Sequence, residues 1–235
     1  MKQRIIIIGG MGPHASLELH RRIIRRASAN GARDGTDFPY IVHLSLPVPD
    51  FIANESRRSE ALEIIINELK NISASIDDVI IIACNTAHLL QPDIEQRLNI
   101  RITSMVDATI DYVSRHHKTI RLLASPTTIR TGLYDKPLKT VGVTVLTPDD
   151  NERQELETII RALIAGRAVP QLALEKVERI AKFDRVEINN YVENHLNNPP
   201  ILLGCTELSC AFAKKPNTID PMNVLINHLA TRGIL

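Results

Sequence analysis

Short, almost uninterrupted runs of Ile, Val and Leu recur along this chain, and longer stretches of helical period separate them. When such runs form strands they are covered on both faces, which is typical of a parallel sheet between helices. The runs expected to form strands are 4–8, 40–44, 79–83, 120–124, 140–146 and 201–203. The stretches expected to form helices are 15–29, 56–72, 87–98, 107–116, 152–165, 172–194 and 221–231. Their alternation predicts an α/β fold with right-handed crossovers.

Composition narrows the class of protein. A net charge of +1 gives the chain no long-range attraction for nucleic acid or an anionic membrane, and aromatic residues make up only 3% of it. We therefore expect neither a nucleic-acid nor a membrane partner. The 3 cysteines are too few, and odd in number, for a disulfide framework, which favours reduced thiols in a cytoplasmic protein.

Two cysteines stand at matching points in the two halves of the chain. Cys84 follows the apolar run in "IIIACNTAH" and Cys205 follows the run in "ILLGCTEL", with Thr86 and Thr206 close behind them. A duplicated α/β lobe would bring both thiols to the carboxyl ends of strands, where open α/β sheets bind ligands. The alternative is coincidence, because cysteine is a common core residue.

Two facing thiols suit a specific reaction, the inversion of a stereocentre. One thiolate can remove a proton from a carbon while a thiol on the other face delivers one, without a cofactor. The N-terminus of a following helix would lower the pKa of each thiol. Asn85, Thr86 and Thr206 offer an amide and hydroxyls for a carboxylate and for the charge that develops on it.

Five segments carry a resemblance to a known family. They are "GGMGP" (9–13), "ACNTAH" (83–88), "LLASPTTIRTGLY" (122–134), "GCTEL" (204–208) and "IDPMNVL" (219–225). The chain resembles the aspartate/glutamate racemase superfamily, and most of all its aspartate racemase branch. This resemblance implies a cofactor-independent amino-acid racemase, active as a homodimer on a small amino acid. It also implies two pseudo-symmetric Rossmann-like lobes, each a mainly parallel sheet flanked by helices, with the active site in the cleft between them.

The resemblance also assigns residues and boundaries. It implies that residues 1–105 with 220–235 form the lobe that carries Cys84, and residues 106–219 the lobe that carries Cys205. These two cysteines are the implied acid/base pair, with no metal. The implied substrate-binding residues are Met11, Gly12, Asn85, Thr86, Thr128, Thr206 and Glu207.

Two positions depart from the aspartate racemase pattern. Phe51 stands where that branch has an arginine, and Ile164 stands where it has a lysine, both of which bind the side-chain carboxylate of the substrate. Burying that carboxylate without a cation would be costly. We therefore expect an altered or broadened side-chain specificity, unless Arg161 replaces the missing cations.

Other interpretations remain open at this stage. The superfold also includes enzymes such as maleate isomerases and malonate-type decarboxylases, and a non-catalytic amino-acid sensor would keep the same residues. The turn at Gly10 fits a dinucleotide fingerprint but lacks the acidic residue expected after the next strand. His88 is expected either to tune the thiol of Cys84 or to serve packing. Cys210 is expected to be a buried structural thiol, and the arginines of 21–26 a solvated helix face.

Overall fold

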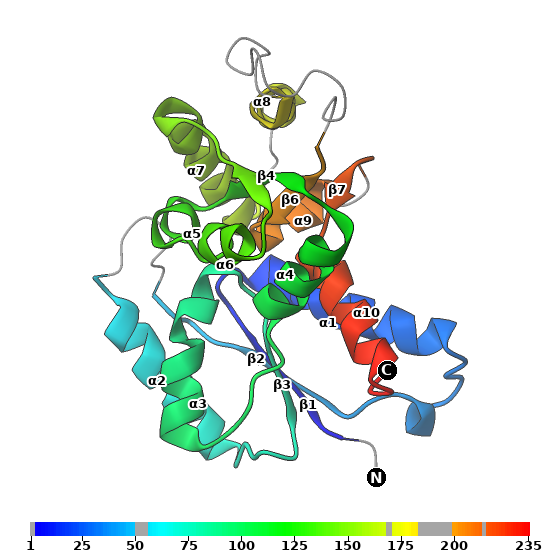
Figure 1. Cartoon of the computed structure of the whole chain (residues 1–235). Coiled ribbons are helices and arrows are strands. Elements are labelled where there is room, and N and C mark those ends of the chain that lie inside the picture. The colour runs from blue at the N-terminus through cyan, green and yellow to red at the C-terminus, as the bar shows by residue number, and fades with distance from the viewer. Residues whose placement is uncertain (1–2, 50–55, 168–170, 183–198, 213–214) are drawn as a thin grey trace.

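The computed structural model describes residues 3–49, 56–167, 171–182, 199–212 and 215–235, and it contains two parallel sheets flanked by helices (Figure 1). The first sheet has the order β2-β1-β3 and the second the order β5-β4-β6-β7. The strands are β1 (Ile5–Gly9), β2 (Ile41–Ser45), β3 (Val79–Ile82), β4 (Thr119–Ala124), β5 (Thr144–Leu146), β6 (Ile201–Gly204) and β7 (Thr218–Ile219). The expected α/β class is confirmed.

The apolar runs are buried on both faces of the first sheet, as their continuity predicts. In β1, Ile6 and Ile8 belong to the core shared with α2 (Arg58–Asn71) and α3 (Gln91–Leu98). Ile5 and Ile7 face the opposite side, where they pack with α1 (Pro13–Ala29) and α10 (Pro221–Thr231). Helix α10, near the end of the sequence, therefore covers one face of the first sheet, which contains β1.

The second sheet is covered in the same way. Leu123 and Leu203 pack with α7 (Asp150–Ile164), α8 (Gln171–Lys182) and α9 (Thr206–Phe212). Leu122 and Leu202 face the core formed with α4 (Met105–His116) and α6 (Asp135–Thr140). Near α6 lies the short helix α5 (Pro126–Thr131), which Ser125 caps by accepting from the backbone N–H of Thr128.

Three boundaries differ from the sequence expectation. The strand expected over 140–146 is only β5, because α6 continues to Thr140 and Gly142 turns the chain at φ 79°. The helix expected over 87–98 is divided into the 3₁₀ helix η2 (Thr86–Leu90) and α3, whose first turn carries Pro92. Of the helix expected over 172–194, α8 accounts for the part up to Lys182, and 183–194 lie outside the described residues. A short 3₁₀ helix, η1 (Gly35–Asp37), was not expected.

The arginines of α1 are not all solvated, which corrects the sequence interpretation. The side chain of Arg22 is 13% exposed and pairs with Glu18 at 2.7 Å. Its guanidinium also bonds Asp220, which caps α10 and is 3% exposed, and it reaches Oδ1 of Asn223 at 2.9 Å. Arg22 thus connects α1 to the start of α10.

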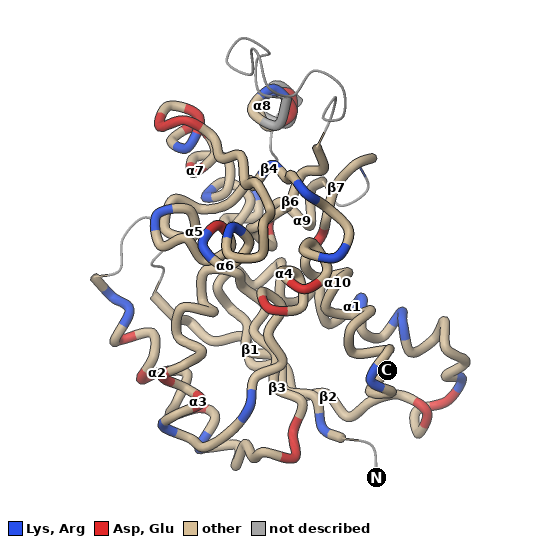
Figure 2. The backbone as a smooth tube through the Cα atoms, in the orientation of Figure 1, with Lys and Arg blue, Asp and Glu red and all other residues tan. Residues whose placement is uncertain are grey.

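Elsewhere, charged side chains of both signs are spread over the helices that flank the two sheets (Figure 2). Among the described residues, no helix has the length and apolar character to cross a membrane.

Candidate active site

Cys84 and Cys205 lie just past the carboxyl ends of β3 and β6, which pair with β1 and β4, respectively. Cys84 follows β3 by two residues, and Cys205 follows β6 directly and precedes α9. Both are buried, at 8% and 7% exposure, and each belongs to the core of its own sheet. The structure therefore gives the two thiols equivalent places in two similar layers.

Several hydrogen bonds join the two halves of the chain around these cysteines. The backbone N–H of Gly12 donates to Oε1 of Glu207 at 3.2 Å. The hydroxyl of Thr206 donates to the carbonyl of Ala83, the residue before Cys84, at 3.4 Å. The hydroxyls of Thr86 and Thr128 are 2.9 Å apart. Five of the predicted binding residues therefore take part in these bonds: Gly12 with Glu207, Thr86 with Thr128, and Thr206 with the residue before Cys84.

The Cys205 thiol has a carboxylate partner. Its Sγ donates to Oε2 of Glu207 at 3.2 Å, and the hydroxyl of Thr206 also lies 3.2 Å from this oxygen, which is an alternative acceptor to the carbonyl of Ala83. Glu207 is only 4% exposed, and burial raises its pKa although these hydrogen bonds oppose the rise. The distances therefore fit a hydrogen bond from the Cys205 thiol to the Glu207 carboxylate.

The expected lowering of the Cys205 pKa is wrong for this structure. Burial raises the pKa of Cys205 well above its usual range, and the charge of Glu207 and the hydrogen bond to it raise it further. The charge of Cys84 adds to this effect. The backbone N–H of Glu207, in the first turn of α9, lowers the pKa of Cys205, but by less than the other causes raise it.

His88 serves the backbone around Cys84 rather than its thiol. Its Nε2 accepts from the backbone N–H of Met105 at 3.2 Å, so Nδ1 carries the proton and donates to the carbonyl of Cys84 at 2.8 Å. Burial lowers the pKa of His88, which keeps the ring neutral. The structure therefore favours the packing and capping interpretation of this histidine.

Asn85 is fixed by a residue that the sequence interpretation did not select. The hydroxyl of Tyr134 donates to its Oδ1, and both side chains are buried, at 0% and 1% exposure. The Nδ2 of Asn85 is also buried and has no hydrogen-bond partner among the described residues. Tyr134 lies at the end of the quoted motif "LLASPTTIRTGLY", which was the available signal.

A second residue outside the expected set, Ser125, completes a cluster of hydroxyls. Its Oγ is 2.9 Å from Oγ1 of Thr86 and donates to Oγ1 of Thr128 at 3.1 Å. All three residues are buried. The Ser-Pro pair that begins α5 could have identified Ser125 as a helix cap but not as a partner of Thr86.

The remaining predicted residues fall around the same place. Met11 packs against the core that contains Cys84. A Cβ at Gly12 would lie 3.4 Å from Cγ2 of Ile164, so Ile164 stands beside this turn. Arg161 is 43% exposed and pairs with Glu157 at 2.8 Å. Phe51 lies outside the described residues.

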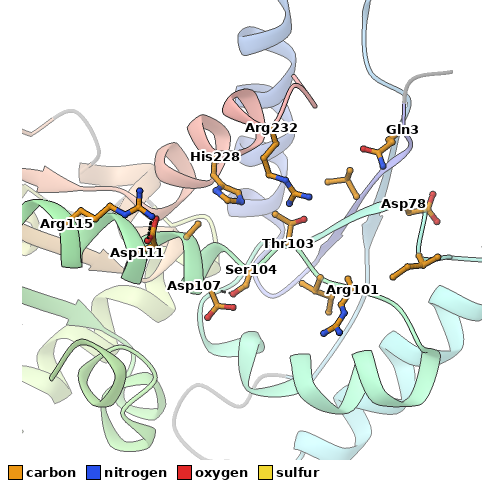
Figure 3. Close-up of a pocket in the computed structure, with 14 residues that line it drawn as sticks. Gln3, Asp78, Arg101, Thr103, Ser104, Asp107, Asp111, Arg115, His228 and Arg232 are labelled. Carbon is orange, nitrogen blue, oxygen red and sulfur yellow. Dashed lines mark hydrogen bonds and ion pairs between the residues drawn. The ribbon is translucent and has the colours of Figure 1, made fainter. Parts of the chain in front are cut away.

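Other features lie apart from this cluster. Cys210 is exposed, which corrects its expected burial. The described residues contain no group of His, Cys, Asp and Glu that could hold a metal ion. The pocket in Figure 3 borders Gln3 and Val79, at the amino ends of β1 and β3, and contains neither Cys84 nor Cys205. It is therefore at the opposite end of the first sheet from the cysteines.

Comparison with known families identifies the chain's relatives. The sequence profile of the family described as Asp/Glu/Hydantoin racemase matches residues 8–229. The chain belongs to this family. It is also similar to the broad specificity amino-acid racemase RacX of Bacillus subtilis (strain 168), with 27% identity over 158 residues, 67% of this chain and 69% of the relative.

Solved structures of this family have the same fold. An aspartate racemase homologue from Pyrococcus horikoshii OT3 superposes with a TM-score of 0.71 at 26% identity, covering 99% of each chain. Picrophilus torridus aspartate racemase has a TM-score of 0.75 at 23% identity, covering 98% of this chain and 94% of its own. Family and fold confirm the resemblance read from the motifs, and they make this chain an amino-acid racemase, which is an isomerase.

Proposed function

We propose that this racemase inverts the Cα of an amino acid with Cys84 and Cys205 as its two acid/base groups and without a cofactor. The observation that carries the proposal is the equivalent place of the two buried thiols at the carboxyl ends of β3 and β6, with hydrogen bonds between their neighbours. These bonds run from Gly12 to Glu207 and from Thr206 to Ala83.

The reaction needs one thiolate and one thiol at a time. In one direction the Cys84 thiolate takes the Cα proton, so that the C–H bond breaks and an S–H bond forms. Cys205 then gives its own proton to the opposite face of the carbon, leaving a thiolate there. In the other direction the roles are exchanged. Glu207 accepts from Cys205 and favours its thiol form, which suits the first direction.

The carbanion formed at Cα needs stabilisation through its carboxylate. The buried Nδ2 of Asn85 supplies a donor. The next residue, Thr86, has a hydroxyl, and this hydroxyl is 2.9 Å from that of Thr128. Donors held in a site without bulk water stabilise developing charge strongly. We assign Met11, Gly12, Thr206 and Glu207 to the same substrate site.

The side-chain pocket is proposed to accept uncharged amino acids as well as, or in place of, aspartate. Ile164 offers an apolar surface beside Gly12, and Arg161 is engaged with Glu157. A side-chain carboxylate there would be buried without a partner cation from these residues. The Bacillus subtilis relative is a broad specificity amino-acid racemase, which is in line with this proposal.

The larger organisation is also a proposal. Residues 1–105 with 220–235 would form one lobe and 106–219 the other, which the packing of α10 on the first sheet supports. We further propose a homodimer, on the resemblance to aspartate racemases. A cytoplasmic location would keep the thiols reduced, as the reaction requires.

The decisive assay measures racemisation over a panel of amino acids by chiral chromatography. Cys84→Ser and Cys205→Ser are each expected to lose roughly a thousandfold in rate, since serine is a far weaker acid/base at neutral pH. Cys210→Ser is the matched control, because Cys210 is exposed, and it should keep full activity. Full activity in either of the first two variants would overturn the proposal. So would conversion of maleate or a malonate in place of an amino acid, or stabilisation by amino acids without turnover.

A further inference from the structure

Tyr134 is a buried tyrosine whose hydroxyl is aimed at a residue of the other half of the chain. It immediately precedes α6 and belongs to the core of the second sheet, where its exposure is 0%. Asn85 follows Cys84, and its Oδ1 accepts from the Tyr134 hydroxyl. A tyrosine needed only for packing would be served equally well by phenylalanine, so the hydroxyl calls for a reason.

The hydroxyl determines which way the Asn85 amide points. A primary amide has an acceptor oxygen and a donor nitrogen, and the two can be exchanged by rotation about χ2. Burial raises the pKa of Tyr134 well above its usual range, so the hydroxyl keeps its proton and remains available as a donor. Because Oδ1 of Asn85 accepts this proton, the amide is fixed with Nδ2 pointing away from Tyr134.

The Nδ2 atom of Asn85 is a buried donor without an acceptor among the described residues. Asn85 is 1% exposed. A buried donor without a partner is costly, and native proteins rarely keep one unless a ligand completes it. The neighbour on one side is Cys84, and on the other is Thr86, whose hydroxyl belongs to the cluster with Ser125 and Thr128.

We propose that Tyr134 is a positioning residue, which holds the Asn85 amide so that Nδ2 donates to the α-carboxylate of an amino acid bound beside Cys84. This inference rests on the proposed function, because it takes that function's substrate. It goes further by naming a residue that does not touch the substrate but holds the Asn85 amide in the orientation that binding requires.

The test uses Tyr134→Phe, Asn85→Ala and the double variant in the full chain. Tyr134→Phe should lower kcat/KM about tenfold, the effect of one lost hydrogen bond. If Tyr134 acts only through Asn85, the double variant should be no slower than Asn85→Ala alone. Tyr112→Phe is the control, since Tyr112 is 37% exposed and stacks on His116, and it should match the wild type. Thermal unfolding of each variant monitors the fold.

A binding measurement separates this inference from the proposed function. By calorimetry, Tyr134→Phe should bind the best-bound L-amino acid of the panel about tenfold more weakly than the wild type does. It should bind the corresponding amine, which lacks the carboxylate, with the wild-type affinity. Equal loss for both ligands, unchanged amino-acid affinity, or a double variant with additive losses would overturn the inference. Weakened amino-acid binding in a chain that does not racemise would support it while contradicting the proposed function.

Discussion

The Sγ atom of Cys205 lies 3.2 Å from Oε2 of Glu207, and Oε1 of the same carboxylate accepts from the backbone N–H of Gly12 at 3.2 Å. Glu207 therefore connects one proposed acid/base group to the turn that follows β1. Because a buried carboxylate disfavours a thiolate beside it, this contact raises the pKa of Cys205.

Glu207→Gln should change the pH profile of the enzyme in a defined direction. The pair of thiols is active when it holds one proton, so the alkaline limb of kcat/KM marks the loss of that last proton. Burial and Glu207 raise the pKa of Cys205, and removing the carboxylate lowers it. The alkaline limb should therefore move to lower pH by about one unit, in both reaction directions. Glu157→Gln, on the surface of α7, should not move it, and an unmoved or higher limb in Glu207→Gln would contradict this role.

Gly12→Ala should damage the site without straining the backbone. Gly12 has φ −104°, which alanine tolerates, but its Cβ would lie 2.8 Å from Oε1 of Glu207. The displaced carboxylate should cost on the order of a hundredfold in kcat/KM, because small displacements at a reacting centre are expensive. Gly35→Ala, with no atom within 4 Å of the new Cβ, is the control. Wild-type kinetics in Gly12→Ala would show that this contact is not needed.

Ile164→Lys should shift specificity toward acidic amino acids. The new ammonium would stand near the Gly12 turn, where it could pair with a substrate side-chain carboxylate. The ratio of kcat/KM for aspartate to kcat/KM for a neutral amino acid should rise about tenfold, the value of roughly 1.4 kcal/mol. Ile164→Met, which keeps length without charge, should leave the ratio unchanged. Equal ratios in the two variants would refute the assignment of this position.

Arg22→Met should destabilise the fold through a buried charge left alone. Asp220 is 3% exposed, and Arg22 is its ion-pair partner at the start of α10. Breaking a buried pair by removing one partner costs about 3 kcal/mol in the free energy of unfolding. Arg21→Met removes a neighbour that is 45% exposed and should cost roughly 0.5 kcal/mol or less. Urea unfolding of both variants measures the difference, and equal stability would contradict the importance of the Arg22 pair.

The α/β fold was predictable because the main strands and helices have recognisable local patterns of apolar residues. The four consecutive isoleucines of β1 are buried on both faces, and their continuity in the sequence already implied helices on both sides. Boundaries were less predictable where helices met tight turns. The apolar pattern before Leu146 could not reveal that α6 would end at Thr140 and that a turn at Gly142 would leave only three residues for β5.

The positions of the cysteines were predictable, but their surroundings were not. A strand that ends in Cys84 or Cys205 can be read from the sequence, whereas the pairing of Tyr134 with Asn85 joins residues from different sheets. The direction of the Cys205 pKa depends first on burial, which the local sequence does not specify, and then on Glu207 two residues away. Arg22 looked like a surface residue because its partner Asp220 is almost the whole chain away.

The most direct measurement of the two-thiol mechanism is the place of deuterium at low conversion in D2O. A thiol holds a single proton, so a deprotonating thiol returns only the proton it took, while the opposite thiol delivers a deuteron from solvent. The product enantiomer should therefore carry deuterium at Cα, and the remaining substrate should carry almost none. Deuterium appearing equally in both enantiomers, or a product that retains the original proton, would contradict inversion by Cys84 and Cys205.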